Sequence, residues 1–202
     1  MSGPIIDLGD VARKASEDQF WALRGHAIQA YASLEQSLCR LLAYLGAMSG
    51  EVAALIFFRI TSTQARNTIL EKLFRYKFGD KFNLFRNSLI SQLRPIDTER
   101  NEIVHWNTVN NVGVGEGGLS TISVTLRPPA FIYNIKNSPE KTVDDLIEFM
   151  QKCSFYERLL NMFIPTTDDS YDMPGFDKIP WLSIFSQPIV YPPLAGHPLL
   201  QT

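Results

Sequence analysis

Three side chains suited to phosphate chemistry lie close together in the segment RNEIVHW, residues 100–106. Arg100 carries a permanent positive charge, and His105 is a side chain that titrates near neutral pH. Asn101 follows the arginine directly, so the pattern is R-N-x3-H. A cation that can hold a phosphate, beside a group that can transfer protons, indicates phosphoryl chemistry.

The segment is predicted to be helical, and helical geometry limits how these residues can cooperate. At about 100° per residue, Asn101 and His105 stack one turn apart, whereas Arg100 and His105 diverge by roughly 140°. The arginine must therefore reach around the helix, or the site must be shared between two chains. Cleavage of RNA by its own 2′-hydroxyl needs a base, an acid on the leaving oxygen and a cation on the phosphate, and one histidine supplies only one of the first two roles at a time. Two copies of the motif that face each other across a two-fold axis would supply both.

A purely structural interpretation of the motif stays open. In that case Arg100 pairs with Glu99, Glu102 or Asp97. His105 is then a helix-end residue that the helix dipole favours. The segment would perform no chemistry.

A second group of polar residues interrupts the apolar seams of the helix predicted over 50–78. Arg59, Arg66 and Asn67 fall where a bundle helix normally carries apolar side chains. A buried guanidinium without a partner carries a large desolvation cost, so these residues need partners or a cleft. We expect them to bind substrate; the alternatives are a buried ion pair with Glu35 or another acid, or a surface position.

Apolar residues at spacings of three and four predict helices over about 11–48, 50–78 and 81–106. Ser49 or the glycine after it caps the second of these helices, and the glycine after the helix ends it. Pro95 must kink or interrupt the third, because proline lacks a backbone donor and clashes with the preceding turn.

The segment after the motif changes character. Residues 107–118 are rich in Asn and Gly and predict a loop, while alternation over 122–126 predicts a strand that 131–135 would pair with. A serine followed by proline predicts the start of a fourth helix, 138–163. The buried seam of that helix is expected to be Phe149, Cys153, Tyr156, Leu160 and Phe163.

Residues 165–202 contain seven of the twelve prolines of the chain, interleaved with aromatic residues. This composition predicts an extended or irregular tail that packs on the bundle or on a partner chain.

The composition narrows the class of protein. The 202 residues are 45% hydrophobic and 20% charged, which is typical of a soluble globular protein. Neither a membrane-spanning run nor a secretory signal is evident, so we expect a cytoplasmic protein. Cys39 and Cys153 fall among apolar residues and are expected to be buried thiols. The net charge is −2, but residues 59–105 hold nine Lys and Arg against five Asp and Glu, so any nucleic-acid site is local to this segment.

With its R-N-x3-H motif on a late helix, the chain resembles the HEPN superfamily, whose members share a small bundle of about four or five helices and an R-x4-6-H motif. The similarity covers roughly residues 11–163, and Asn101 agrees with the family's preference for a polar residue after the arginine. We therefore expect a mainly α protein: an antiparallel four- to five-helix bundle over 1–164, a small β-hairpin insertion at 108–137, and the extended tail at 165–202.

The resemblance implies a homodimer that lines a shared cleft with its two motifs. It also implies a metal-independent endoribonuclease that acts on RNA, needs no cofactor and leaves 2′,3′-cyclic phosphate ends. The resemblance assigns phosphate binding to Arg100, general acid–base catalysis to His105 and an orienting role at the site to Asn101. Such a protein would be a toxin or a defence effector, with an antitoxin or regulatory protein as a further partner.

Two other functions stay open. One is a non-catalytic helical interaction or regulatory module that docks through its tail. The other is a nucleotide-binding protein that uses the same Arg and His to hold a phosphate without cleaving it.

Overall fold

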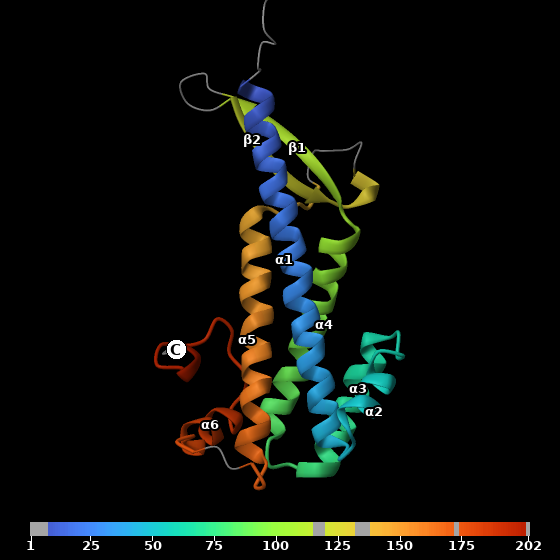
Figure 1. Ribbon diagram of the computed structural model, residues 1–202, viewed down its shortest axis with the longest axis vertical. Coiled ribbons are helices and arrows are strands. Elements are labelled where there is room, and N and C mark those ends of the chain that lie inside the picture. The colour runs from blue at the N-terminus through green and yellow to red at the C-terminus, as the bar shows by residue number, and fades with distance from the viewer. Residues whose placement is uncertain (1–7, 115–119, 132–137, 172–173, 201–202) are drawn as a thin grey trace, which may run out of the picture. The chain divides into compact units, whose positions relative to one another are not determined.

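The computed structural model describes residues 8–114, 120–131, 138–171 and 174–200. The chain is mainly helical and carries a small antiparallel hairpin (Figure 1). Its elements are, in chain order, α1 (Leu8–Leu45), α2 (Gly50–Phe57), α3 (Thr63–Phe78), α4 (Asn83–His105), β1 (Asn107–Val114), β2 (Ser120–Arg127), the 3-10 turn Pro129–Phe131, α5 (Val143–Thr167), α6 (Lys178–Phe185) and the 3-10 turn Pro198–Leu200.

These elements form two compact units. The hairpin unit consists of Met1–Gln29 and Glu99–Met150, and the aromatic unit consists of Ala30–Thr98 and Gln151–Thr202. Along the chain, α1, α4 and α5 each pass from one unit into the other. The R-N-x3-H motif belongs to the hairpin unit, and the three residues predicted to bind substrate belong to the aromatic unit.

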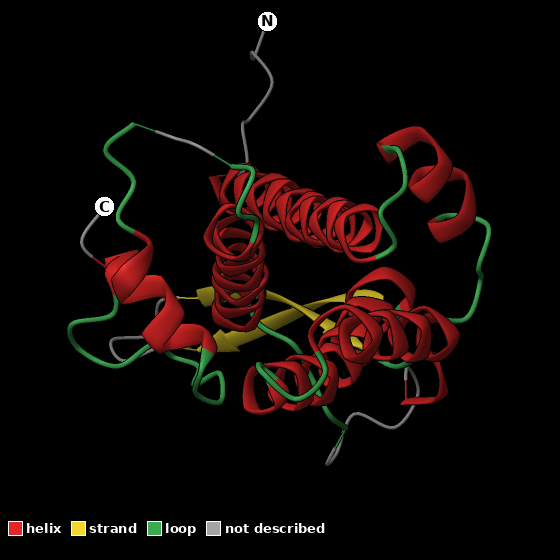
Figure 2. Ribbon diagram, turned by 90° about the horizontal axis from the view of Figure 1, so that it is seen from below, coloured by secondary structure: helices red, strands yellow, loops and turns green. Residues whose placement is uncertain are grey.

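In the hairpin unit, β1 and β2 pair antiparallel along their whole lengths (Figure 2). The predicted strand exists as β2, but its burial does not alternate: Val124 and Leu126 are buried, and so are the polar residues Thr125 and Arg127. The backbone of Leu126 also exchanges two hydrogen bonds with Lys141, at 2.8 and 3.0 Å. These bonds attach the segment before α5 to the outer edge of the hairpin.

The loop predicted over 107–118 is wrong for its first part, because β1 occupies Asn107–Val114. Asparagine and glycine are poor strand formers on their own, and here the strand exists because β2 satisfies its backbone groups. Residues 132–137, which include most of the predicted partner strand 131–135, lie outside the described residues.

The helix predicted to begin at Ser138 begins at Val143 instead. The Asp145 amide donates to the Thr142 hydroxyl at 3.3 Å, and the Asp145 carboxylate accepts from the Thr142 amide at 2.6 Å. This reciprocal cap satisfies two backbone donors, which a cap at Ser138 could not do, because the residue three positions later is Lys141 and not an acid. The cap therefore sets the start of α5.

In the aromatic unit, the core is built around Phe163 of α5, which is fully buried. The whole predicted seam of this helix is buried, and both cysteines are free thiols inside, as predicted. Five further phenylalanine rings surround Phe163, with centroids 4.9 to 5.7 Å away: Phe185, Phe74, Phe85, Phe82 and Phe78.

The single helix predicted over 50–78 is wrong in its middle, where α2 ends and α3 begins. Its two ends are right: the Ser49 side chain caps α2, and Gly79 ends α3 with a φ of 57°. Between them, the Ser62 hydroxyl accepts from the Ala65 amide at 3.2 Å and starts a new helix. Ser and Thr side chains compete for backbone groups in this way, and that local competition outweighs the continuous apolar period.

Of the two effects predicted for Pro95, an interruption does not occur, because this residue lies inside the continuous helix α4. The prediction for the tail needs correction. The tail contains a regular helix, α6, which is capped by the Asp177 carboxylate. Phe185 of α6 packs on Phe163, and the Tyr191 ring lies 5.4 Å from that of Phe155. The tail is thus held by aromatic contacts within its own unit.

Candidate active site at the end of helix α4

The R-N-x3-H motif forms the last two turns of α4. Asn101 and His105 are exposed on adjacent turns, while Arg100 is half-buried. The Arg100 guanidinium donates to the Asn101 side-chain oxygen at 3.0 Å. Asn101 therefore contacts the arginine directly, which fits the orienting role that the resemblance implies for it.

The acidic neighbours of the motif are bound by a lysine from another segment. Lys141 lies 3.0 Å from the Glu102 carboxylate and 3.5 Å from that of Glu99. Burial by itself would lower the pKa of Lys141, but the hydrogen bond to Glu102 and the charges of both carboxylates outweigh it, so the pKa is raised. Two of the acids proposed to pair with Arg100 therefore share one cation, Lys141.

The third of those acids, Asp97, belongs to the aromatic unit. Its carboxylate accepts a hydrogen bond of 2.7 Å from the Tyr31 hydroxyl. Burial raises the pKa of Asp97, although this hydrogen bond and the charge of Arg66 act in the opposite direction.

The C-terminal end of α4 is capped by a side chain of α1. The Arg24 guanidinium donates to the backbone carbonyls of Ile103, Val104 and Trp106, at 2.8, 2.9 and 3.1 Å. The last four carbonyls of a helix have no partner within it, and a cation at this end also complements the helix dipole. Arg24 therefore fixes the backbone turn that carries His105.

Sequence reasoning missed Arg24, although a signal for it was present. Phe20, Ala27 and Tyr31 form a buried stripe of α1 at helical spacing, and Arg24 lies on that stripe. A cation within an apolar seam needs a partner, which is the reasoning that singled out Arg59 and Arg66. Applied to α1, it would have found Arg24.

Two tryptophans accompany the cap. The Trp21 side chain is 51% exposed, and the Arg24 guanidinium lies 5.0 Å from its ring centroid. The Lys141 ammonium lies 5.8 Å from the ring centroid of Trp106. Both cations that organise the end of α4 thus also contact an indole ring.

The residues predicted to bind substrate belong to the aromatic unit, whereas the motif belongs to the hairpin unit. Arg66 forms an ion pair of 2.5 Å with Glu35 and lies 4.9 Å from the ring centroid of Phe57. This is the ion pair considered as the alternative for that seam. Asn67 is buried, and Arg59 is exposed in the turn after α2. Because Arg66 already has a carboxylate partner, we do not include it in the proposed site.

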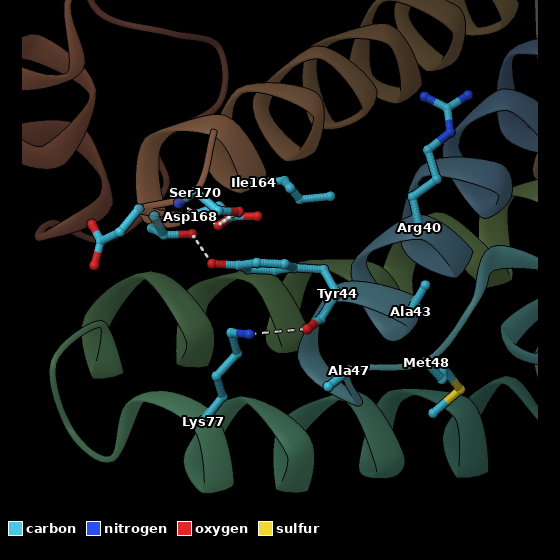
Figure 3. Close-up of a pocket in the computed structure, with 11 residues that line it drawn as sticks. Arg40, Ala43, Tyr44, Ala47, Met48, Lys77, Ile164, Asp168 and Ser170 are labelled. Carbon is cyan, nitrogen blue, oxygen red and sulfur yellow. Dashed lines mark hydrogen bonds between the residues drawn. The ribbon is translucent and has the colours of Figure 1, made fainter. Parts of the chain in front are cut away.

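An open pocket of about 670 Å³ lies in the aromatic unit at the C-terminal ends of α1 and α5, but its charges are balanced (Figure 3). Arg40 and Lys77 line it together with Asp168 and Asp169. The Lys77 ammonium donates to the Tyr44 carbonyl at 3.1 Å and lies 4.0 Å from the Tyr44 ring centroid. Two cations against two carboxylates give this pocket no preference for a polyanion.

No family model, curated protein or solved structure matches the chain. Within the described ranges, no cluster of three or more His, Cys, Asp and Glu side chains could hold a metal ion. Over the same residues, no helix is long and apolar enough to cross a membrane.

Proposed function

We propose that this protein is a metal-independent endoribonuclease of the HEPN type, with His105 as its acid–base group and Arg100 as its phosphate ligand. The observation that carries the proposal is the exposure of the motif at the end of α4. His105 and Asn101 are exposed on adjacent turns of one helix end, with the Arg100 guanidinium bonded to Asn101. The end itself is capped by three hydrogen bonds from Arg24.

The chemistry assigned to these residues is transesterification. A neutral imidazole removes the proton of the RNA 2′-hydroxyl, whose oxygen attacks the adjacent phosphorus. The guanidinium stabilises the charge that develops on the phosphoryl oxygens. The bond to the 5′-oxygen then breaks, an imidazolium protonates that oxygen, and a 2′,3′-cyclic phosphate remains.

The reaction needs a base and an acid together, so one motif is insufficient. His26 and His197, the other two histidines of the chain, lie on α1 and in the tail, not on the motif helix. We therefore propose a homodimer in which each chain contributes one His105, with opposite protonation states at the start of the reaction.

Lys141 suits this site through its effect on charge. Two carboxylates within two residues of Arg100 would repel an RNA phosphate, and Lys141 binds both of them. The Trp21 side chain, which is half-exposed, offers an indole ring on which a base of single-stranded RNA can stack. Both features favour a single-stranded polyanion as substrate.

The biological role follows from the resemblance alone. We propose a toxin or defence effector that acts on cellular or invading RNA in the cytoplasm. An antitoxin or regulatory protein would then hold its activity in check.

The test is cleavage of a mixed single-stranded RNA in EDTA, with the product ends analysed. The parent should cut and leave cyclic phosphates, whereas His105→Ala and Arg100→Ala should cut at least 100-fold more slowly. That factor is typical for the loss of a general acid or base and for the loss of a group that stabilises transition-state charge. His26→Ala is the matched control, because His26 is an exposed histidine of the same unit. Undiminished cutting by His105→Ala would refute the proposal. Nucleotide binding without cutting by the parent would favour the binding protein instead.

A further inference from the structure

Helix α2 exposes a row of large apolar side chains. Leu55 is 67% exposed, Phe58 in the cap position is 55% exposed and Val52 is 46% exposed. The opposite side of the helix, with Ala53 and Phe57, is buried. An amphipathic helix normally turns its apolar residues inward, so a second apolar face on the outside indicates a contact surface.

The exposed face is symmetric about Leu55. Glu51 and Val52 precede it by four and three residues, and Phe58 and Arg59 follow it by three and four. At about 100° per residue, Glu51, Val52 and the cap residue Phe58 fall within roughly 60° of the direction of Leu55, and Arg59 follows in the turn after the helix. A groove of about 510 Å³ runs along this face, lined by Glu51, Ala54, Leu55, Phe58 and Arg59.

The two ends of the face carry opposite charges. Glu51 and Arg59 are both exposed, and neither has an ion-pair partner within the described part of the chain. Glu51 lies in the first turn of α2 and Arg59 lies beyond its last turn, and the two do not pair with each other. Each end of the face therefore presents an unmatched charge.

We infer that α2 docks on α2 of a second copy of this chain, antiparallel, about a two-fold axis at Leu55. In this arrangement Glu51 meets the partner's Arg59, Arg59 meets the partner's Glu51, and each Val52 meets the partner's Phe58. A two-fold axis requires a surface that complements itself, and the sequence around Leu55 meets this requirement in both charge and apolar character. The inference does not depend on the proposed ribonuclease activity.

The size of the surface sets the expected affinity. An eight-residue helix covers less than the roughly 800 Å² per partner of a standard interface. We therefore expect a reversible association with a dissociation constant on the order of micromolar.

Sedimentation equilibrium over a range of concentrations tests the pairing. The mass of the parent should rise with concentration, and Leu55→Glu should halve the mass of the associated species. Ile179→Glu is the matched control: Ile179 is 76% exposed on α6, and its replacement should leave the mass unchanged. A parent that stays monomeric, or a Leu55→Glu protein of unchanged mass, would overturn the inference.

Charge reversal identifies the partner side chains. Glu51→Arg and Arg59→Glu each place like charges opposite one another and should weaken association at least fivefold, whereas the double reversal should restore it. Circular dichroism checks that each variant keeps its helix content. Failure of the double reversal to restore association in folded protein would rule out this antiparallel register.

Cross-linking supplies a readout that does not depend on affinity. A residue on a two-fold axis lies next to its own copy, so Leu55→Cys should form covalent dimers with a short bis-maleimide. The two natural cysteines are buried. Ile179→Cys should stay monomeric, and equal cross-linking of the two variants would contradict the pairing.

Discussion

Replacing Arg24 by methionine removes the cap of α4 while keeping an unbranched apolar stem of similar packing. Three backbone carbonyls lose a charged donor that lies within 3.1 Å of each of them. A hydrogen bond to a charged group contributes about 1.5 to 3 kcal/mol. Because the Arg24 side chain is partly exposed, water replaces part of this contribution, and we expect a loss of about 2 to 3 kcal/mol in the stability of the hairpin unit.

The geometry of the arginine predicts how a lysine should behave. The guanidinium reaches Ile103 through Nε and Val104 and Trp106 through Nη2, and a single ammonium cannot span these positions. Arg24→Lys should therefore recover less than half of the lost stability. If the proposed ribonuclease activity is present, both variants should cut RNA more slowly than the parent at saturating substrate, because His105 is no longer held in place.

Amide hydrogen exchange in the last turn of α4, combined with urea denaturation, measures this effect. Arg40→Met is the control, since Arg40 is an exposed arginine of the same helix with a single side-chain hydrogen bond, to Asn161. Exchange in Arg24→Met that matches the parent, together with a stability change below about 0.5 kcal/mol, would refute the capping role.

Three further outcomes are expected. Asp97→Asn should be at least as stable as the parent at pH 7, because burial raises the pKa of Asp97 and the amide oxygen can still accept from Tyr31. In urea denaturation the free energy of unfolding of the parent should rise relative to that of the variant as the pH falls through the folded pKa of Asp97. A variant that is less stable than the parent at pH 7 would contradict this prediction. Burial lowers the pKa of His197, whose Nδ1 accepts from the Leu199 amide. The stabilisation present above the ordinary value of about 6.5 should therefore be lost as the pH falls from that value through the lowered folded pKa, whereas His197→Asn should show no such loss. Phe163→Ala should lower the free energy of unfolding by about 4 kcal/mol and raise proteolysis of the tail, and an intact tail in that variant would show that the ring cluster does not hold it.

The sequence predicted well those elements in which one periodic signal decides the structure. The seam of α5 lies at spacings of four and three, and every one of its residues is buried. The start of α2 at Ser49 and the end of α3 at Gly79 were predictable for a different reason, because a capping hydroxyl and a glycine act on their immediate neighbours.

Elements that depend on a distant partner escaped prediction. The Asn and Gly residues of β1 give it little strand propensity of its own, and the backbone hydrogen bonds to β2 stabilise it as a strand. At Ser62 two local signals conflict, and the capping hydroxyl outweighs the apolar period.

The candidate site also combines features that local sequence predicts with features that depend on distant segments. The exposure of His105 and Asn101 follows from their place on one face of α4. The partners of this site, Arg24 and Lys141, come from segments far away in the sequence, and no spacing rule connects them to the motif. Arg66 shows the reverse case, because its position in a seam indicated a partner and the partner is Glu35.

The continuity of α1, α4 and α5 through both units bears on how such a protein can change during evolution. Chains usually exchange modules at exposed linkers, where few backbone hydrogen bonds are cut. Here each boundary, after Gln29, Thr98 and Met150, falls inside a helix. A recombination that replaced one unit would break three helices at once and leave several backbone donors and acceptors unsatisfied at every new end. The hairpin unit and the aromatic unit should therefore be inherited together, and variation should enter through substitutions and through the turns between helices.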